Sequence, residues 1–287
     1  MDYRDKTAVI TGAASGIGRA LAVELANRGA HVAISDVNAV GLAETAALCK
    51  KDGVDVRTYE LDVADRGAVL QHAEEVRRDF GAAHLVVNNA GVALGATVEE
   101  MTWEDYDWLM GINLGGVVHG TKAFLPLLVE SGTKEEKTHV VNVSSVFGFI
   151  GVPTQSAYNA AKFAVRGFTE ALRQELIIGR RPVSAHCVHP GGIKTNIAAA
   201  ARTSDTLDMD AEQRAKDFAR IARTTPEKAA RTILRGVDRD AARILIGLDA
   251  MVFDAVPRVL GARYEGIAAR GTRLLGPRMG IDLQGEK

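Results

Sequence analysis

A glycine-rich turn near the amino terminus restricts the possible folds of this chain more than any other feature. Gly12, Gly16 and Gly18 follow an apolar run, Thr7–Thr11, that is typical of a buried strand, and they open a helical period over Ile17–Arg28. Glycines at such a junction let the backbone approach a ligand closely, and the helix N-terminus attracts phosphate. The spacing Gly-x-x-x-Gly-x-Gly also suits a turn that only packs the helix on the strand, so both interpretations stay open here.

The rest of the chain alternates between strand-like and helix-like patterns. Apolar runs predict parallel strands at Thr7–Thr11, Val32–Ser35, Val54–Tyr59, Leu85–Asn88, Val140–Ser144, Ser184–His189 and Arg243–Ile246. Three- and four-residue spacing predicts helices at Ile17–Arg28, Val40–Lys50, Arg66–Phe80, Ile112–Val129 and Ala157–Ile177. Thr102 and Thr225 are expected to cap two more helix starts. This alternation predicts an α/β fold with a doubly wound parallel sheet of the Rossmann type.

Composition argues against several classes of function. Among 287 residues, 35 Lys and Arg nearly balance 36 Asp and Glu, so we expect no nucleic-acid partner. No run approaches the roughly 18 apolar residues of a membrane span. No signal peptide is recognisable, so we expect a cytoplasmic protein that is not bound to membranes. Cys49 and Cys187 lack the close spacing of a metal pair or a disulfide, and no metal site is expected.

Asp36 ends the second predicted strand. In a dinucleotide fold, an acid at this place accepts hydrogen bonds from the ribose 2′- and 3′-hydroxyls and repels a 2′-phosphate. Val37 and Asn38 bring no basic group, and Arg19 is expected to point away from the ribose. A helix cap is the alternative role for Asp36. The glycine turn upstream favours the ribose role, which predicts NAD as the cofactor.

A tyrosine, a lysine and a serine form the second constellation. Tyr158 and Lys162 lie four residues apart on one face of the predicted helix Ala157–Ile177, and Ser145 lies thirteen residues before Tyr158. A phenol loses its proton only near about pH 10, and a neighbouring ammonium lowers that pKa. The tyrosine can then act as a general acid or base. Tyr-x-x-x-Lys alone would more often be an ordinary helix surface, but the serine and the glycine turn favour catalysis.

These motifs resemble those of the short-chain dehydrogenase/reductase family. They match in order and spacing from about Thr7 to Thr195, and they comprise Gly12, Gly16, Gly18, Asn88, Asn89, Ala90, Gly91, Asn113, Ser145, Tyr158 and Lys162. The resemblance implies hydride transfer between NAD(H) and a small-molecule alcohol or ketone.

The resemblance also implies catalytic roles. Tyr158 would be the acid/base, and Lys162 would lower its pKa and hold the nicotinamide ribose. Ser145, rather than Ser144, would polarise the substrate oxygen. Asn113 would hold a water that links Lys162 to solvent.

The implied cofactor contacts extend over the whole matched region. Asp62 and Val63 would contact adenine, Asn89–Gly91 would flank a ribose, Ile193 would meet the carboxamide and Thr195 would cap that end. The full set is Gly12, Ser15, Gly16, Ile17, Gly18, Asp36, Asp62, Val63, Asn89, Ala90, Gly91, Tyr158, Lys162, Pro190, Gly191, Ile193 and Thr195.

Two further expectations concern the substrate and the alternative function. Apolar side chains that would line the substrate site favour an apolar secondary alcohol or ketone, and they are Phe147, Phe149, Ile150 and Val152. The alternative is a catalytically inactive dinucleotide-binding sensor or scaffold. Such a protein would be expected to lose Tyr158 or Lys162, and both are present.

The expected organisation is one domain with a C-terminal extension. Residues 1–247 would form the dinucleotide-binding and catalytic domain, with an insertion of one or two short helices at about 195–224. The extension, 248–287, carries an apolar stripe that includes Met251, Val252 and Val259, and this stripe should be buried at the pocket or at a subunit interface. Pro257 should kink or restart its helix.

We also expect a homo-oligomer, either a tetramer or a dimer. The family resemblance implies pairing through the helices Ile112–Val129 and Ala157–Ile177. The second of these has more apolar residues than one buried face needs, including Phe163, Phe168 and Leu172.

Overall fold

A seven-stranded parallel sheet forms the centre of the computed structural model, which describes residues 1–204 and 222–275. Its order is β3-β2-β1-β4-β6-β7-β9, with every neighbouring pair parallel. The strands are β1 (Thr7–Thr11), β2 (His31–Asp36), β3 (Val56–Glu60), β4 (Leu85–Asn88), β6 (Thr138–Val143), β7 (Val183–Pro190) and β9 (Arg243–Ile246). The predicted doubly wound sheet is confirmed, and each predicted strand is present with slightly shifted ends.

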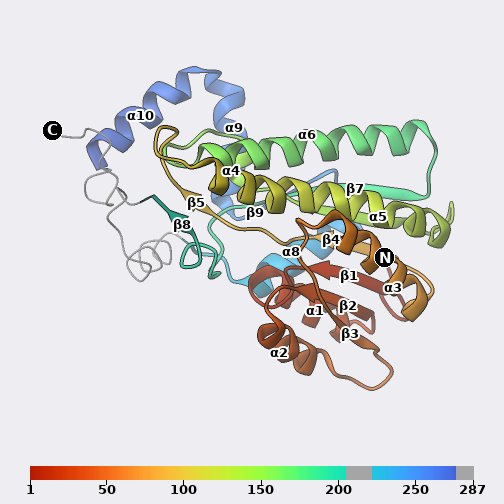
Figure 1. Cartoon of the computed structure of the whole chain (residues 1–287). Helices are drawn as coiled ribbons and strands as arrows, with labels where there is room; N and C mark the ends of the chain where they lie inside the picture. The colour runs from red at the N-terminus through yellow and green to blue at the C-terminus, as the bar shows by residue number, and fades with distance from the viewer. Residues whose placement is uncertain (205–221, 276–287) are drawn as a thin grey trace.

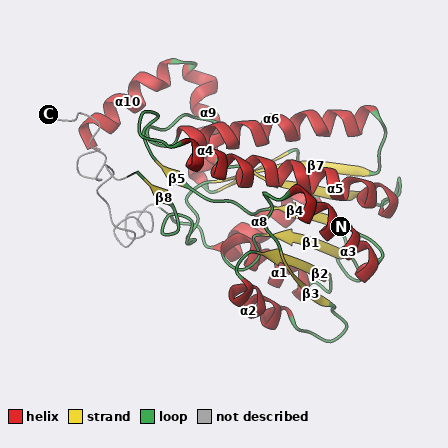
Figure 2. Cartoon of the chain, in the orientation of Figure 1, coloured by secondary structure: helices red, strands yellow, loops and turns green. Residues whose placement is uncertain are grey.

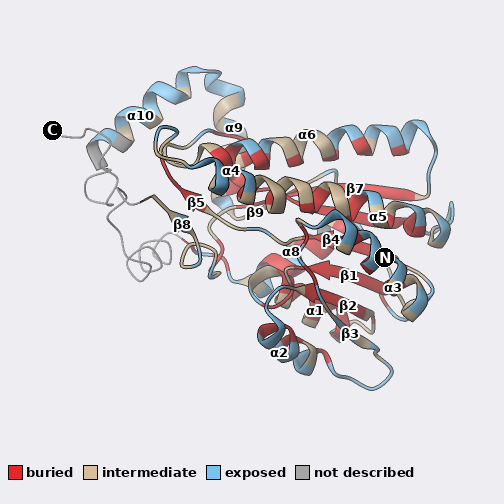
Figure 3. Cartoon of the chain, in the orientation of Figure 1, coloured by how far each residue is buried: buried red, intermediate tan, exposed pale blue. Residues whose placement is uncertain are grey.

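Helices cover both faces of this sheet (Figures 1 and 2). One face carries α1 (Gly16–Asn27), α2 (Ala39–Cys49) and α8 (Pro226–Asp238), and the other carries α3 (Arg66–Phe80), α5 (Gly116–Ser131) and α6 (Ser156–Ile178). Two apolar cores result, with Leu21 and Ile233 in one and Phe124 and Leu128 in the other. Because both faces are covered, the central strands are buried along their length (Figure 3).

The helix expected at Ile112 begins earlier. α4 (Trp103–Met110), the π-helical segment η1 (Gly111–Gly115) and α5 form one continuous helix. Thr102 caps its start as predicted, because Thr102 Oγ1 accepts a hydrogen bond from Asp105 N at 3.1 Å. By length and composition this helix could cross a membrane, and 44% of its most apolar 18-residue window is buried inside the described fold.

The described part of the predicted insertion forms a turn and a short strand. Residues 196–200 form a turn, and β8 (Arg202–Thr203) then pairs with β5 (Leu94–Gly95) in a small second sheet. Arg202 stacks 3.8 Å from the ring centroid of Trp108 and forms an ion pair with Asp105, so this segment is held against α4. Residues 205–221 of the expected insertion lie outside the described residues.

The extension forms two helices, α9 (Leu248–Leu260) and α10 (Arg263–Leu275), at one end of the molecule (Figure 1). In the chain by itself the apolar stripe is not buried against the pocket, because Val252 and Val259 are 57% and 80% exposed, and its burial at a subunit interface stays a prediction. The opposite face of α9, with Ala250, packs inward. The helix also continues through Pro257 and ends at Gly261, whose φ of 55° is left-handed. Residues 276–287 lie outside the described part.

Candidate active site

The residues expected to carry chemistry lie at the carboxyl ends of neighbouring strands. Gly12 follows β1, Asn89 follows β4, Ser145 lies just after β6, and Pro190 ends β7. β1 lies between β2 and β4, so the connections on its two sides run to opposite halves of the sheet. Parallel α/β sheets bind ligands outside the strand ends at such a switch point. The topology therefore gathers motifs that are far apart in the sequence.

Ser145, Tyr158 and Lys162 meet beside the end of β6. Ser145 precedes the 3-10 turn η2 (Val146–Gly148), and Ser145 Oγ accepts a hydrogen bond from Phe147 N at 3.1 Å. Tyr158 and Lys162 lie one turn apart on α6, and the Tyr158 hydroxyl is hydrogen-bonded to Ser145. Because an amide N–H occupies one lone pair of Ser145 Oγ, the serine proton can point to Tyr158 or to a substrate oxygen.

Burial dominates the pKa values of Lys162 and Tyr158. Lys162 is 3% exposed, and its Nζ donates to Val143 O at 3.1 Å and lies 5.6 Å from the Tyr158 ring centroid. Burial lowers the pKa of Lys162 to about 8. Burial also raises the pKa of Tyr158, and the hydrogen bond from Ser145 opposes this rise only in part.

In the protein by itself, burial dominates the pKa of Tyr158, and the expected lowering of this pKa by Lys162 stays a prediction. The ammonium is bound to a backbone carbonyl, and the cost of desolvating a phenolate outweighs the favourable interactions.

Asn113 lies inside the π-helical segment η1, where it is fully buried. Its Oδ1 accepts from Val92 N at 2.8 Å, and its Nδ2 donates to Val92 O at 2.9 Å. A Cβ added at Gly91 would lie 3.1 Å from Asn113 Oδ1 and 3.6 Å from Lys162 Nζ, so the asparagine is close to the lysine as expected. The side chain itself fixes the turn after Gly91, and the water-holding role of this residue stays a prediction.

The glycine turn fits an anion at the start of α1. Gly12 has a φ of 66°, and a Cβ there would come within 2.7 Å of Ala90 Cα. A Cβ at Gly18 would overlap Gly12 O. The Ser15 side chain makes no capping hydrogen bond, so the first N–H groups of α1, from Gly16 onward, are available to a phosphate.

Thr11, which the sequence analysis did not single out, braces this turn. Its Oγ1 accepts from Asn89 N at 3.0 Å and from Ala90 N at 3.1 Å. Asn89 Nδ2 donates to Thr11 O at 3.0 Å and to Gly12 O at 3.2 Å. The Asn89 side chain thus holds the glycine turn. The only sequence signal for Thr11 was its place directly before Gly12.

Asp36 lies at the end of β2 against the same turn. Its Oδ2 accepts from Ala14 N at 2.9 Å, and its Oδ1 accepts from Asn38 N at 3.0 Å. Arg19 does not point away as expected, because its guanidinium donates to Ala14 O and to Glu44 at 2.8 Å. Glu44 offsets the charge of Arg19, so the acid at Asp36 remains the group most suited to a ribose.

The implied adenine contacts occupy different environments. Asp62 is exposed, and its Oδ1 accepts from Ala64 N at 2.9 Å. Val63 is buried, and a Cβ added at Gly116 of α5 would lie 2.6 Å from its Cγ2. The backbone after β3 is therefore held against α5.

The segment after β7 closes on the glycine turn. Ile193 is 3% exposed, and it pairs with Thr224 in an isolated bridge. The Cγ2 atom of Thr195 lies 3.1 Å from the position of a Cβ at Gly16. Two sequence motifs implied in cofactor binding thus lie close together.

The apolar residues expected around the substrate divide into two groups. Phe147 and Val152 keep part of their surface exposed, but Phe149 and Ile150 are only 4% and 7% exposed. Phe149 stacks on His189 with ring centroids 4.1 Å apart, which holds it in the interior. Phe149 and Ile150 are thus as buried as Ser145, and the prediction that these four side chains line the substrate site stays a prediction.

Asn159, a second residue that the sequence analysis missed, organises this loop. Its Nδ2 donates to Phe147 O at 2.8 Å and to Ile150 O at 2.7 Å, and its Oδ1 accepts from Val152 N at 3.0 Å. Its position directly after Tyr158 was the available signal. The residue couples the helix of the candidate acid/base to the candidate substrate loop.

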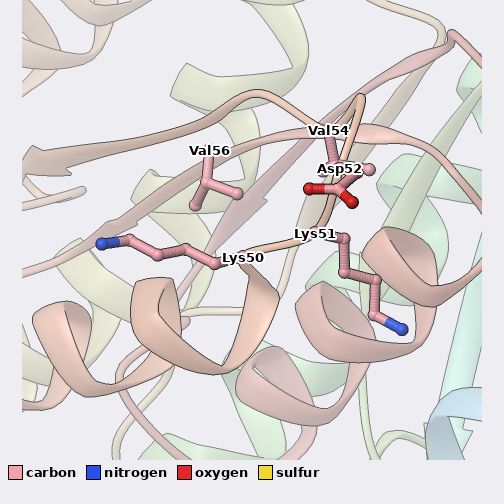
Figure 4. Close-up of a pocket in the computed structure, with 5 residues that line it drawn as sticks. All are labelled: Lys50, Lys51, Asp52, Val54 and Val56. Carbon is pink, nitrogen blue, oxygen red and sulfur yellow. The ribbon is translucent and has the colours of Figure 1, made fainter.

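A hollow of about 450 Å³ lies elsewhere, in the connection from α2 to β3 (Figure 4). It is lined by Lys50, Lys51, Asp52, Val54 and Val56. Because β3 begins at Val56, this hollow is at the amino end of the sheet, away from the catalytic motifs. It contributes nothing to the candidate site.

The fold and the glycine turn define a dinucleotide-binding protein of the Rossmann type. The family model of short chain dehydrogenases matches residues 6–206, and the chain belongs to this family of oxidoreductases. It is 49% identical over 271 residues to SadH of Mycobacterium tuberculosis, which carries the name of an oxidoreductase, and the match covers 94% of this chain and 96% of that protein. It is 34% identical to a C alpha-dehydrogenase of Sphingobium, covering 85% and 81% of the two chains.

Solved structures agree with this assignment. A short-chain dehydrogenase/reductase from Burkholderia phymatum in complex with NAD has a TM-score of 0.82 and 28% identity, with 91% of this chain and 95% of that chain covered.

Proposed function

We propose that this chain is an NAD(H)-dependent oxidoreductase that transfers a hydride between NAD(H) and an apolar secondary alcohol or ketone. The observation that carries this proposal is the hydrogen-bonded pair of Ser145 and Tyr158 with Lys162 buried beside it. Their position at the carboxyl end of β6, next to the glycine turn, would bring a substrate oxygen and a nicotinamide ring together.

The residues present fit a dinucleotide. Side chains at Gly12 and Gly18 would fill the space of the turn, and the uncapped start of α1 offers N–H groups to a pyrophosphate. When bound, the cofactor supplies the hydride acceptor or donor. Asp36 would hold the adenosine ribose, and Lys162 would hold the nicotinamide ribose.

The proton would move at the Tyr158 hydroxyl. In alcohol oxidation, Ser145 Oγ donates a hydrogen bond to the substrate oxygen while Tyr158, as phenolate, takes the hydroxyl proton. In ketone reduction, the neutral Tyr158 gives its proton to that oxygen. The raised pKa of Tyr158 keeps it protonated at neutral pH, which favours the reducing role for the free protein. Lys162 is charged below about pH 8 and would stabilise the phenolate that remains.

Turnover is the direct test of this activity. Absorbance of NADH should fall with apolar ketones and should rise when NAD and the matching secondary alcohols are supplied. A protein that binds NADH tightly but turns over no member of such a panel would instead fit the sensor or scaffold role.

Cofactor preference is a separate test that needs no substrate. Fluorescence titration should show tighter binding of NADH than of NADPH, because Asp36 repels a 2′-phosphate. Asp36→Ala should relax this preference, and Asp55→Ala, which removes an exposed acid before β3, should not. Equal or tighter NADPH binding by the unmodified protein would reject the assignment to NAD.

A further inference from the structure

The first turn of α9 contacts the segment that follows β7. Asp249 Oδ2 accepts a hydrogen bond from Gly192 N at 2.6 Å. The preceding residue, Gly191, faces the same carboxylate so closely that an added Cβ would overlap it. Gly191 N in turn donates to Ile246 O at 3.0 Å. A side chain of the extension therefore fixes the backbone just before Ile193.

The first turn of α10 contacts the other side of the candidate site. Gly151 N donates to the Tyr264 hydroxyl oxygen at 3.1 Å. Gly151 lies between Ile150 and Val152, whose backbone groups are held by Asn159. The loop before the Tyr158 helix is thus fixed from two directions, by α6 and by the extension.

We propose that the C-terminal extension is a two-point clamp on the active site, in which Asp249 and Tyr264 are positioning residues. Asp249 holds the segment that would meet the nicotinamide, and Tyr264 holds the loop that would meet the substrate. This assignment rests on the proposed function, because it places Asp249 on the cofactor side of the active site and Tyr264 on the substrate side.

The two contacts have separable consequences. A carboxylate that accepts from a backbone N–H makes a strong, charge-assisted hydrogen bond. Its loss should loosen Gly191–Gly192 and weaken cofactor binding. The Tyr264 contact is neutral and shares the loop with Asn159, so its loss should act more weakly and only on the substrate.

The test uses single variants of the full chain. Asp249→Ala should raise the Kd of NADH by about tenfold in a fluorescence titration, while Asp249→Asn, which keeps an acceptor oxygen, should recover most of the affinity. Tyr264→Phe should raise the KM of the alcohol by about threefold and leave the Kd of NADH unchanged. Glu265→Gln removes a charge from the same extension without a hydrogen bond to either segment, and neither constant should change.

A second measurement tests the geometry at Gly191. Gly191→Ala should weaken NADH binding strongly when Asp249 is present, and less when Asp249→Ala has made room for the new methyl group. Thermal unfolding of every variant identifies any that fail to fold.

Several outcomes would overturn the clamp. One is an unchanged NADH affinity in a folded Asp249→Ala variant. Another is that Gly191→Ala and Asp249→Ala have additive effects on NADH affinity in the double variant. A Tyr264→Phe variant that shifts NADH affinity instead of the substrate KM would also contradict it. If the unmodified protein bound no NADH at all, the proposed function itself would fail.

Discussion

At the scale of single residues, the Tyr158 hydroxyl is the group on which the proposed chemistry depends. Tyr158→Phe should lower turnover by about a hundred- to ten-thousand-fold, because it removes proton transfer but keeps the ring. The Kd of NADH should stay unchanged. Since the pKa of Tyr158 is raised, kcat/KM for alcohol oxidation by the unmodified protein should increase with pH through the alkaline range as the phenolate forms.

Tyr59→Phe is the matched control for this substitution. Tyr59 is on the edge strand β3, which β2, β1 and β4 separate from β6, and its hydroxyl donates to Asp79 of α3 at 2.9 Å. Its loss should affect stability and leave the rate and its pH profile unchanged. Near-normal turnover by Tyr158→Phe would show that another group transfers the proton.

Lys162 gives a second prediction, on stability. Its pKa falls from 10.5 to about 8 on folding, so between these pH values the unfolded chain holds a proton that the native protein lacks. The free energy of unfolding should therefore rise with pH across this window, and the full cost of the buried charge, of order 3 kcal/mol, applies below it.

Lys162→Met should remove this cost and raise the melting temperature at pH 7, although it should abolish turnover. Thermal denaturation at pH 7 and at pH 10 measures both effects. The exposed Lys122→Met serves as control and should change neither. A lower melting temperature for Lys162→Met at pH 7 would mean that the hydrogen bond from Lys162 to Val143 O stabilises the fold by more than the desolvation of the lysine charge costs.

At the scale of elements, the junction of β1 and α1 depends on close backbone approach. Gly18→Ala would place a methyl group on Gly12 O and should both destabilise the fold and abolish NADH binding. Gly266→Ala is the control on α10, where an added Cβ meets nothing within 4 Å. This substitution should raise the free energy of unfolding by about 0.5–1 kcal/mol. Thermal unfolding and NADH titration measure the pair, and normal NADH binding by Gly18→Ala would contradict the tight turn.

At the scale of the whole molecule, the described residues include exposed apolar faces on α6 and α9. On α6, Phe163 and Ile178 are 41% and 81% exposed, whereas Leu172, which was expected to join this face, is buried in the chain's own core. α9 presents Val252 and Val259 on its outer side. Apolar faces of this kind are typical of subunit contacts.

We expect light scattering to show a dimer or a tetramer, and Phe163→Glu on α6 should reduce the mass. Val259→Glu tests the α9 face in the same way. If Val259→Glu lowers the mass and Phe163→Glu does not, the main subunit interface lies on the extension and not on α6. A monomeric mass for the unmodified protein at working concentration would contradict the expected oligomer.

Local features were within reach of the sequence alone. The apolar runs, the spacing of Gly12, Gly16 and Gly18, and the four-residue separation of Tyr158 and Lys162 predicted the sheet, the first turn and the candidate catalytic pair. These features follow from backbone geometry that repeats over a few residues, so a linear pattern contains them.

Only the tertiary structure decided which partners those residues have. Lys162 Nζ donates to Val143 O, Asp249 accepts from Gly192 N, and the apolar side of α9 faces outward. Hydrogen-bond partners and desolvation depend on residues that are distant along the chain, and periodicity contains no information about them. An apolar stripe marks a helix face, but what covers that face is set by the packing of the whole molecule.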